Sequence, residues 1–341
     1  TDKARRSGRV YLGILLGTSI AFLLFAILVT ALAADTLEFT PGGILHDQVP
    51  VWLATVLLPL FVYGIGKAAL MPFHRWLPAA MVAPTPVSAL LHAVAVVKAG
   101  VFAILKICVY IYGFDLLQSV SSTQILLYMT GFTVVVASVI AMRQDNLKAR
   151  LAYSTIGQLA YITMGALLAN AAGVTGASMH LAVHAMAKIT LFFCAGAIMV
   201  AAHETQNILM HGLGRQMPLT FVAFFIASLS IVGLPPTGGT WSKWYLLTGT
   251  VDGGQWLMML CLLLSSLLSI AYLLPIPLRA FVPAGGDAVS VEKSAIAEAP
   301  LPSLIALLFT ALCCLGLFFF PQSLYELAAA IAVAAGGNHG A

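Results

Sequence analysis

The sequence predicts an all-α polytopic membrane protein with about nine transmembrane helices, and three observations support this fold class. Of the 341 residues, 61% are hydrophobic and 8% are charged, whereas soluble domains have about 45–50% apolar and about 25% charged residues. Apolar runs recur at the length of about 20 residues that a helix needs to cross a bilayer. Basic residues gather in every second connection between these runs, as they do in oriented membrane proteins.

The apolar runs define the predicted helices. They fall at 10–34, 51–71, 86–112, 123–142, 151–169, 177–202, 218–248, 255–279 and 302–321. The first run follows TDKARRSGRV and is longer than the apolar core of a signal peptide, so we expect a membrane helix there. Residues 283–300 form the one long polar linker and are predicted to be a cytoplasmic loop.

The distribution of charge predicts the orientation. With a cytoplasmic N-terminus, the cytoplasmic segments hold most of the basic residues, namely Lys3, Arg5, Arg6, Arg9, Arg75, Arg143, Lys148, Arg150, Arg215, Arg279 and Lys293. The opposite segments hold no Lys or Arg; these are 35–50, 113–122, 170–176, 249–254 and 322–341. Because cytoplasmic loops carry the excess of Lys and Arg, we predict that the N-terminus is cytoplasmic.

Two predicted helices contain breaks. Segment 64–78 holds two glycines and two prolines, and segment 233–239 holds three glycines and two prolines. Inside a bilayer, such breaks are tolerated only where protein or a wet cavity satisfies the backbone. Lys67 and Lys243 lie beside them. Paired broken helices in two halves of a chain are typical of inverted-repeat transporters.

Five basic residues fall within the predicted spans: Lys67, Lys98, Lys106, Lys188 and Lys243. A lysine at mid-membrane costs roughly 2.5–3.5 kcal/mol on insertion scales, so several of them indicate a path for charge. Lys106 lies near a span end and could instead reach the interface, and Lys148 is interpreted as a cytoplasmic-end base. No Asp or Glu lies at the centre of a span. The buried amines are therefore partly neutral, or a carboxylate comes from elsewhere.

His180, His184 and Lys188 lie at positions i, i+4 and i+8 of one run. On a helix they share one face, about 6 Å apart in rise, and protonatable groups at this spacing can pass a proton along it. In the alternative interpretation, the histidines satisfy tertiary hydrogen bonds and Lys188 reaches toward the interface.

No cofactor or metal is predicted. Haem between His92 and His184 is the less favoured alternative, because neither histidine has a matching partner pattern. The net charge of +4 is spread thinly, and nucleic acid is not an expected partner. The five cysteines lie in apolar runs without CxxC or Cys/His spacing: Cys108, Cys194, Cys261, Cys313 and Cys314.

Four stretches carry a family resemblance: GKAALMPFHRWLPAAMVAPTPVSALLHAVAVVKAGVF, DNLKARLAYSTIGQLAYITMGAL, HLAVHAMAKITLFF and GLPPTGGTWSKWYLL. Over roughly residues 50–250 they resemble, in family order, the proton-translocating antiporter-like family. This family comprises the large membrane subunits of respiratory complex I and of Mrp-type multisubunit cation/proton antiporters. The run HAMAKITLFFCAGAIMVAAHET, with GLGRQMPLT after it, is most similar to a D-type Mrp subunit.

The resemblance implies roles in a proton path for the first half of the chain. Lys67 matches the lysine of the first broken helix, whose family partner is a glutamate on an earlier helix. Lys98 matches the next lysine of the path. His92 occupies a position where some members place a histidine instead.

The second half completes the implied path. Lys188 matches the central lysine, with His180 and His184 as its flanking histidines. Lys243 matches the terminal group on the second broken helix, which some members make a glutamate. No catalytic residue is implied.

Family members have more helices than this sequence. The resemblance therefore implies an inverted-repeat antiporter-like fold that lacks its first helices, and we expect an N-terminally incomplete subunit. Residues 1–113 would be the remainder of the first repeat and 114–282 the second. Residues 283–300 would be the linker, and 301–341 a C-terminal helix and tail.

The resemblance implies a proton-translocating subunit of a multisubunit complex, most simply an Mrp-type monovalent cation/proton antiporter. The alternative is a membrane-arm subunit of NADH-quinone oxidoreductase or a related membrane hydrogenase, and a non-conducting scaffold is the third possibility. The chain would hold no redox centre of its own. The implied partners are other membrane subunits, protons, sodium or potassium, and lipid, in the bacterial cytoplasmic (inner) membrane.

Overall fold

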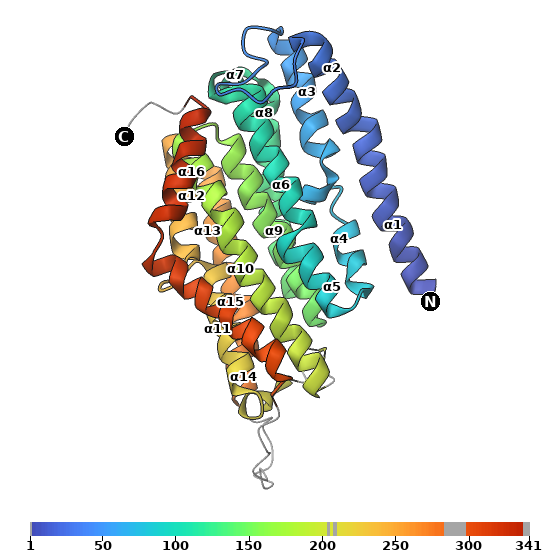
Figure 1. Cartoon of the computed structure of the whole chain (residues 1–341), viewed down its shortest axis with the longest axis vertical. Helices are drawn as coiled ribbons and strands as arrows, with labels where there is room; N and C mark the ends of the chain where they lie inside the picture. The colour runs from blue at the N-terminus through green and yellow to red at the C-terminus, as the bar shows by residue number, and fades with distance from the viewer. Residues whose placement is uncertain (1, 203–204, 207–209, 283–297, 337–341) are drawn as a thin grey trace.

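The computed structural model describes residues 2–202, 205–206, 210–282 and 298–336, without the side chains of Lys3 and His92. Within these ranges the chain is an elongated bundle of helices (Figure 1), and the only β pairing is an isolated bridge between Asn146 and Gln206. The predicted all-α architecture is confirmed.

The helices of the first part of the chain include several short and irregular turns. In order they are α1 (Asp2–Thr18), η1 (Ser19–Leu23), α2 (Leu24–Ala34), α3 (Val51–Gly64), η2 (Gly66–Ala68), α4 (Trp76–Ala79), η3 (Ala80–Val82), α5 (Thr85–Ala89), η4 (Leu90–Val94), α6 (Val96–Lys106), η5 (Ile107–Tyr112) and α7 (Gly113–Ser119). The π-helical turn η1 joins α1 and α2 into one apolar rod at the edge of the bundle.

The helices of the second part are longer and more regular. They are α8 (Ser121–Met142), α9 (Leu147–Leu167), α10 (Ala171–Ala202), η7 (Leu213–Arg215), α11 (Pro218–Val232), α12 (Gly239–Asp252), α13 (Trp256–Leu273), α14 (Pro275–Ala280), α15 (Leu301–Phe319) and α16 (Gln322–Ala334).

Six helical stretches in the described residues are long and apolar enough to cross a membrane: Ala4–Ala34, Val96–Ser119, Ser121–Met142, Ala171–Ala202, Trp256–Ala280 and Leu301–Phe319. Three shorter apolar helices accompany them, namely Val51–Gly64, Pro218–Val232 and Gln322–Ala334. Large apolar side chains such as Leu32 and Phe309 are exposed on the outer helices, as the face toward lipid requires. The chain is a multi-pass membrane protein.

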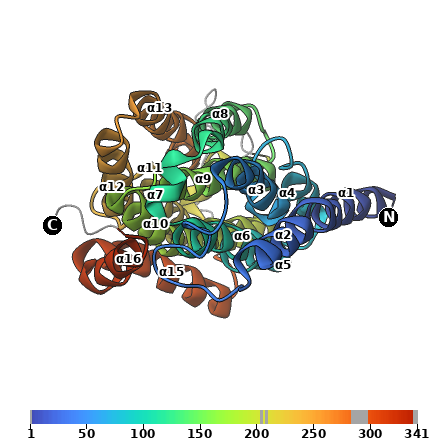
Figure 2. The ribbon, with the colours of Figure 1, turned by 90° about the horizontal axis from the view of Figure 1, so that it is seen from above.

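Helix α9 runs through the centre of the bundle (Figure 2) and packs against α6, α8, α10, α12 and α13. From Leu151 to Leu167, every residue except Tyr153 is buried. Because protein surrounds α9, it needs no apolar face toward lipid and can carry hydroxyl and amide side chains. Helix α9 corresponds to the predicted helix at 151–169. Its polar side chains explain why it is not among the six stretches that are apolar enough to cross a membrane.

Both predicted breaks are present. Helix α3 ends at Gly64, and the Trp76 indole Nε1 donates to the Gly66 carbonyl over 2.9 Å. Helix α11 ends at Val232 and is capped by Gly233, whose φ of 91° suits glycine, and α12 begins at Gly239. Protein groups thus satisfy part of the interrupted backbone, as a break at membrane depth requires.

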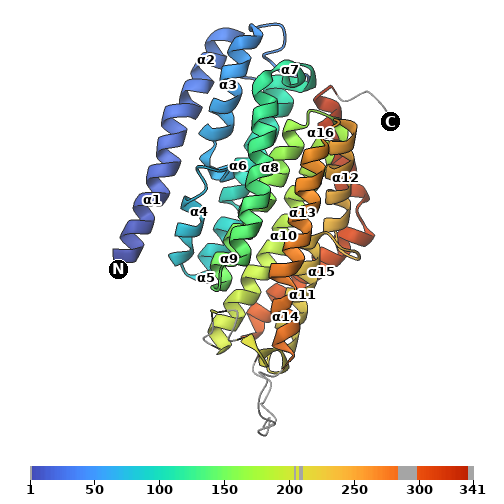
Figure 3. The same cartoon turned by 180° about the vertical axis from the view of Figure 1, so that it is seen from behind.

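The loops gather at two ends of the bundle (Figure 3). At one end, the backbone nitrogen of Leu147 donates to Thr205, and Arg150 donates to the carbonyl of Tyr272. At the other end, Gln118 donates to the carbonyl of Ala169 and Asn170 donates to that of Gly249. Loops predicted to share a side of the membrane therefore lie together.

The C-terminal segment differs from the prediction. Residues 322–341 were expected to be a tail, but they include α16, which packs against α10. The carbonyl of Ala334 accepts from the nitrogen of Gly42, which ties α16 to the 35–50 loop. Pro321 and the polar Gln322 suggest the end of a span in sequence, whereas the chain bends there and continues as a helix. Most of the predicted 283–300 linker lies outside the described residues.

Candidate functional site

Helix α10 carries three protonatable side chains on one buried face. His180 and His184 are each 1% exposed, and Lys188 is fully buried. The two imidazole rings stack with centroids 5.8 Å apart and an angle of 19° between their planes. The spacing of four residues along α10 therefore places these groups one above another, as the sequence predicts.

His180 connects three helices. Its Nε2 lies 3.0 Å from Oε1 of Gln158 on α9, and its Nδ1 lies 2.9 Å from the Ser242 hydroxyl on α12. Because an amide oxygen only accepts, Nε2 carries the proton in this arrangement, and Nδ1 can accept from the serine. This buried histidine is thus held in one orientation.

His184 contacts the lysine of a different helix. Its Nδ1 meets Nζ of Lys98 on α6, and both side chains are buried. A lysine ammonium only donates, so Nδ1 accepts from it, while Nε2 has no hydrogen-bond partner among the described residues. The contact joins an amine and an imidazole, the two groups that could share one proton.

The segment before Lys98 is irregular. The π-helical turn η4 precedes α6, and Ala95 between them has φ −97° and ψ −75°. Single π-helical turns occur frequently at functional sites. His92 lies on η4, but its side chain is outside the described part of the structure.

Lys188 is bound by neutral groups on α9. Its Nζ donates to the Ser154 hydroxyl over 2.7 Å and to the Leu151 carbonyl over 3.2 Å. The hydroxyl of Tyr272 donates to Ser154 over 3.0 Å, and it also meets the hydroxyl of Ser269. A continuous line of hydroxyl groups therefore leads from Lys188 to α13.

Lys243 is bound at the second break. Its Nζ donates over 2.9 Å both to the carbonyl of Val232, the last residue of α11, and to the hydroxyl of Ser266. It also lies 4.9 Å from the ring centroid of Tyr161. The last carbonyls of a helix lack intrahelical partners and attract a cation. The break thus creates the acceptor that holds Lys243.

Lys98, His180, His184, Lys188 and Lys243 form a buried lysine–histidine cluster. Lys67 does not belong to it. It lies on η2, its side chain is exposed, and none of the hydrogen bonds and ion pairs of the described residues includes it. Lys106 is also outside the cluster, with its Nζ 3.7 Å from the ring centroid of Phe39.

The cluster holds its amines without carboxylates. The two ion pairs recorded for the described residues, Arg5 with Asp2 and His46 with Asp47, involve exposed carboxylates far from it in sequence. Lys98 contacts His184 directly, and Lys188 lies one helical turn from His184 on α10. Buried like charges repel one another and lack solvation. The arrangement therefore favours few protons on the cluster at one time.

Several residues of the site were not singled out in the sequence. Ser154, Gln158 and Tyr161 lie on α9 in the order i, i+4 and i+7 and thus share one helical face. Polar side chains at this spacing in a predicted span were the signal that could have identified them. Ser242 and Ser266 contact the cluster from α12 and α13 and carry no comparable pattern.

The curated proteins to which this chain is similar include subunits of NADH-quinone and NAD(P)H-quinone oxidoreductases. NADH-quinone oxidoreductase subunit N of Desulforudis audaxviator is 36% identical over 261 residues, covering 76% of this chain and 50% of the relative. NAD(P)H-quinone oxidoreductase subunit 5 of Paulinella chromatophora (organellar chromatophore 1) is 38% identical over 240 residues, covering 67% of this chain and 33% of the relative. The chain thus spans half or less of the length of these relatives.

Solved structures share the fold. A chain of the Mrp complex from Dietzia sp. is 22% identical with a TM-score of 0.83, over 96% of this chain and 67% of the other. A chain of the archaeal membrane-bound sulfane sulfur reductase is 26% identical with a TM-score of 0.83, over 98% and 68%. A chain of respiratory complex I from Thermus thermophilus is 23% identical with a TM-score of 0.80, over 98% and 70%.

The family described as "NADH:quinone oxidoreductase/Mrp antiporter, TM" matches residues 1–269. This match covers the first predicted repeat, most of the second, both breaks and all the lysines and histidines of the buried cluster. The chain belongs to this proton-translocating antiporter-like family of membrane subunits.

Proposed function

We propose that this chain translocates protons across the membrane as one subunit of a multisubunit complex. The observation that carries the proposal is the buried contact between Lys98 and His184, next to the stacked ring of His180. An amine and an imidazole in direct contact can exchange a proton without water. A non-conducting scaffold would have no use for this costly arrangement.

The proposed path begins at the contact between Lys98 and His184. A proton on Lys98 passes to Nδ1 of His184, and the imidazole can release the proton of its other nitrogen toward the rest of the cluster. Lys188 and Lys243 are the two further amines that can accept it. Lys67 and His92, which lie in the first half of the chain, are included in the proposed path because of the family resemblance.

The kind of complex is the second part of the proposal. The named relatives at 36% and 38% identity are quinone oxidoreductase subunits, which supports a membrane-arm subunit of an NADH-quinone oxidoreductase. An Mrp-type antiporter, favoured by the sequence motifs, remains the second candidate and has support from the shared fold. NADH-driven quinone reduction by the purified complex would favour the first, and sodium- or potassium-driven proton exchange without NADH oxidation the second.

Proton movement into inverted membrane vesicles, followed by quenching of a pH-sensitive dye, tests the proposed function. Transport is started with NADH in one arm and with sodium or potassium in the other. We expect His184→Ala to lower the signal strongly in whichever arm is active, because it removes the group in contact with Lys98. His46→Ala, on the partly exposed side chain beside Asp47, is the matched control and should leave the signal unchanged. Normal transport by His184→Ala in a fully assembled complex would contradict the proposal.

We also propose the bacterial inner membrane as the location, with a cytoplasmic N-terminus. This orientation predicts that Asp252→Cys reacts with an impermeant maleimide added to intact spheroplasts, whereas Arg143→Cys reacts only after permeabilisation. Both side chains are exposed, and they lie on segments assigned to opposite sides. The reverse labelling pattern would overturn the orientation.

A further inference from the structure

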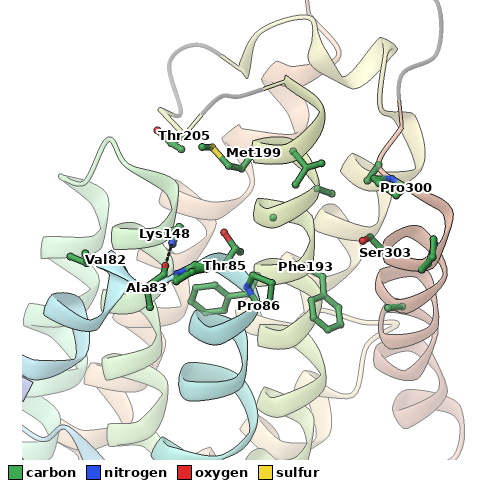
Figure 4. Close-up of a pocket in the computed structure, with 18 residues that line it drawn as sticks. Val82, Ala83, Thr85, Pro86, Lys148, Phe193, Met199, Thr205, Pro300 and Ser303 are labelled. Carbon is green, nitrogen blue, oxygen red and sulfur yellow. Dashed lines mark hydrogen bonds between the residues drawn. The ribbon is translucent and has the colours of Figure 1, made fainter. Parts of the chain in front are cut away.

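A cleft of about 780 Å³ opens at the end of the bundle that holds the basic loops. Its walls come from the turn before α5, the second half of α10 and the beginning of α15 (Figure 4). None of the proposed proton-path residues lines it. The cleft is therefore separate from the buried cluster.

The walls are mostly apolar. Phe192, Phe193 and Val200 of α10 and Ala306 of α15 line its length. Gly196 allows Thr85 to approach α10 closely, since a Cβ at residue 196 would lie 3.1 Å from Cγ2 of Thr85. Such a groove between helices has the dimensions and chemistry of a site for hydrocarbon chains.

The mouth of the cleft is basic. Lys148 donates from Nζ to the Ala83 carbonyl over 2.7 Å, and its ammonium has two further hydrogens to donate. Thr85 on the same wall and Ser303 on the α15 wall add hydroxyl groups (Figure 4). No Asp or Glu is among the lining residues of the described structure. The neighbouring Glu298 instead accepts from Leu219 and Thr220 on α11.

Position and charge together identify the occupant. The cleft lies at the end of the bundle with most Lys and Arg, which in membrane proteins faces the leaflet rich in anionic lipid. Basic pockets between helices on that side bind anionic head groups. A soluble anion would leave the apolar walls unused, and a neutral amphiphile would leave Lys148 without an anion.

We infer that this cleft binds one anionic phospholipid. Its phosphate would take the free hydrogens of Lys148 and the hydroxyl groups at the mouth, and an acyl chain would lie between α10 and α15. The inference goes beyond the proposed proton transport and does not depend on it.

Native mass spectrometry of the full chain, stripped of lipid in detergent, tests this inference. We titrate phosphatidylglycerol and phosphatidylethanolamine of identical acyl chains, and glycerol phosphate as a soluble head group. The wild type should bind one phosphatidylglycerol in preference to phosphatidylethanolamine. Lys148→Gln should weaken phosphatidylglycerol binding roughly fivefold, the effect of one basic residue near an anionic surface, and Lys148→Arg should retain it.

Two further variants separate the head group from the chains. Ala306→Phe fills the groove and should weaken the binding of both lipids, whereas Ala330→Phe on the exposed side of α16 should not. Arg143→Gln removes an exposed charge at the same end and should have no effect. Equal binding of the two lipids by the wild type, unchanged binding by Ala306→Phe, or displacement of the lipid by glycerol phosphate would each overturn the inference.

Discussion

Lys188→Ala is expected to reduce proton transport to the background of vesicles that lack the complex, while the protein still folds. Lys188 is the fully buried amine on the histidine face of α10, and in our proposal it acts as the central lysine of the proton path. Alanine removes the group that accepts and releases the proton. Insertion should become easier, because alanine is apolar and a strong helix former.

The contacts of Lys188 explain why folding should survive. Without its amine, the Ser154 hydroxyl still meets Tyr272, and the Leu151 carbonyl still accepts from Thr155 over 2.9 Å. No acceptor that Lys188 contacts loses its last partner, so the large penalty for an unsatisfied buried group is avoided. The remaining cost is the cavity, typically about 2–5 kcal/mol for a large side chain truncated to alanine.

Two companion variants distinguish the loss of proton exchange from the loss of side-chain volume and of charge. Lys188→Met preserves most of the volume without a titrating group, and Lys188→Arg keeps the charge but does not release its proton. Both should fail in vesicle transport. Lys106→Ala is the matched control, since Lys106 lies over Phe39 and outside the cluster. Near-normal transport by Lys188→Met in an assembled complex would show that Lys188 has only a packing role.

The sequence predicted those parts of the fold that depend on local composition. Apolar runs, glycine and proline clusters, and the alternation of basic loops identified the helices, both breaks and the two groups of loops. The spacing of His180, His184 and Lys188 predicted a shared face because helical geometry alone decides it. The shape of the C-terminal segment depends on packing of α16 against α10, which a hydropathy pattern does not contain.

The partners within the site could not be predicted for a similar reason. The contact of Lys98 with His184 joins residues 86 positions apart, and that of Lys188 with Ser154 joins residues 34 apart. Such pairs follow from the way α6, α9 and α10 pack against one another. Lys67 and Lys243 both lie beside a break, but they differ in burial. Lys243 has acceptors within the chain, whereas Lys67 is exposed.

Gly100→Ala is expected to destabilise the protein, although alanine is the better helix former. A Cβ at residue 100 would lie 2.5 Å from the backbone nitrogen of Ala68 and 2.6 Å from the carbonyl carbon of Lys67. These are backbone atoms, so no side chain can rotate to relieve the clash, and η2 must move away from α6. Forcing extra volume into a packed site typically costs about 1–3 kcal/mol.

Gly17→Ala provides the matched comparison, because it makes the same substitution on α1 with no atom within 4 Å of the new Cβ. There the gain in helix propensity, about 1 kcal/mol, is unopposed. Thermal denaturation in detergent, followed by the loss of the monodisperse peak, should therefore shift downward for Gly100→Ala and stay level or rise for Gly17→Ala.

The shift at Gly100 should also affect transport. Gly100 lies two residues after Lys98, and it packs directly on the turn that carries Lys67. Moving η2 away from α6 therefore separates the first-half lysine from the amine that contacts His184. We expect any Gly100→Ala protein that assembles to transport protons more slowly than Gly17→Ala at the same amount of folded complex. Equal melting temperatures and equal rates for the two variants would show that the packing of η2 against α6 can relax without cost.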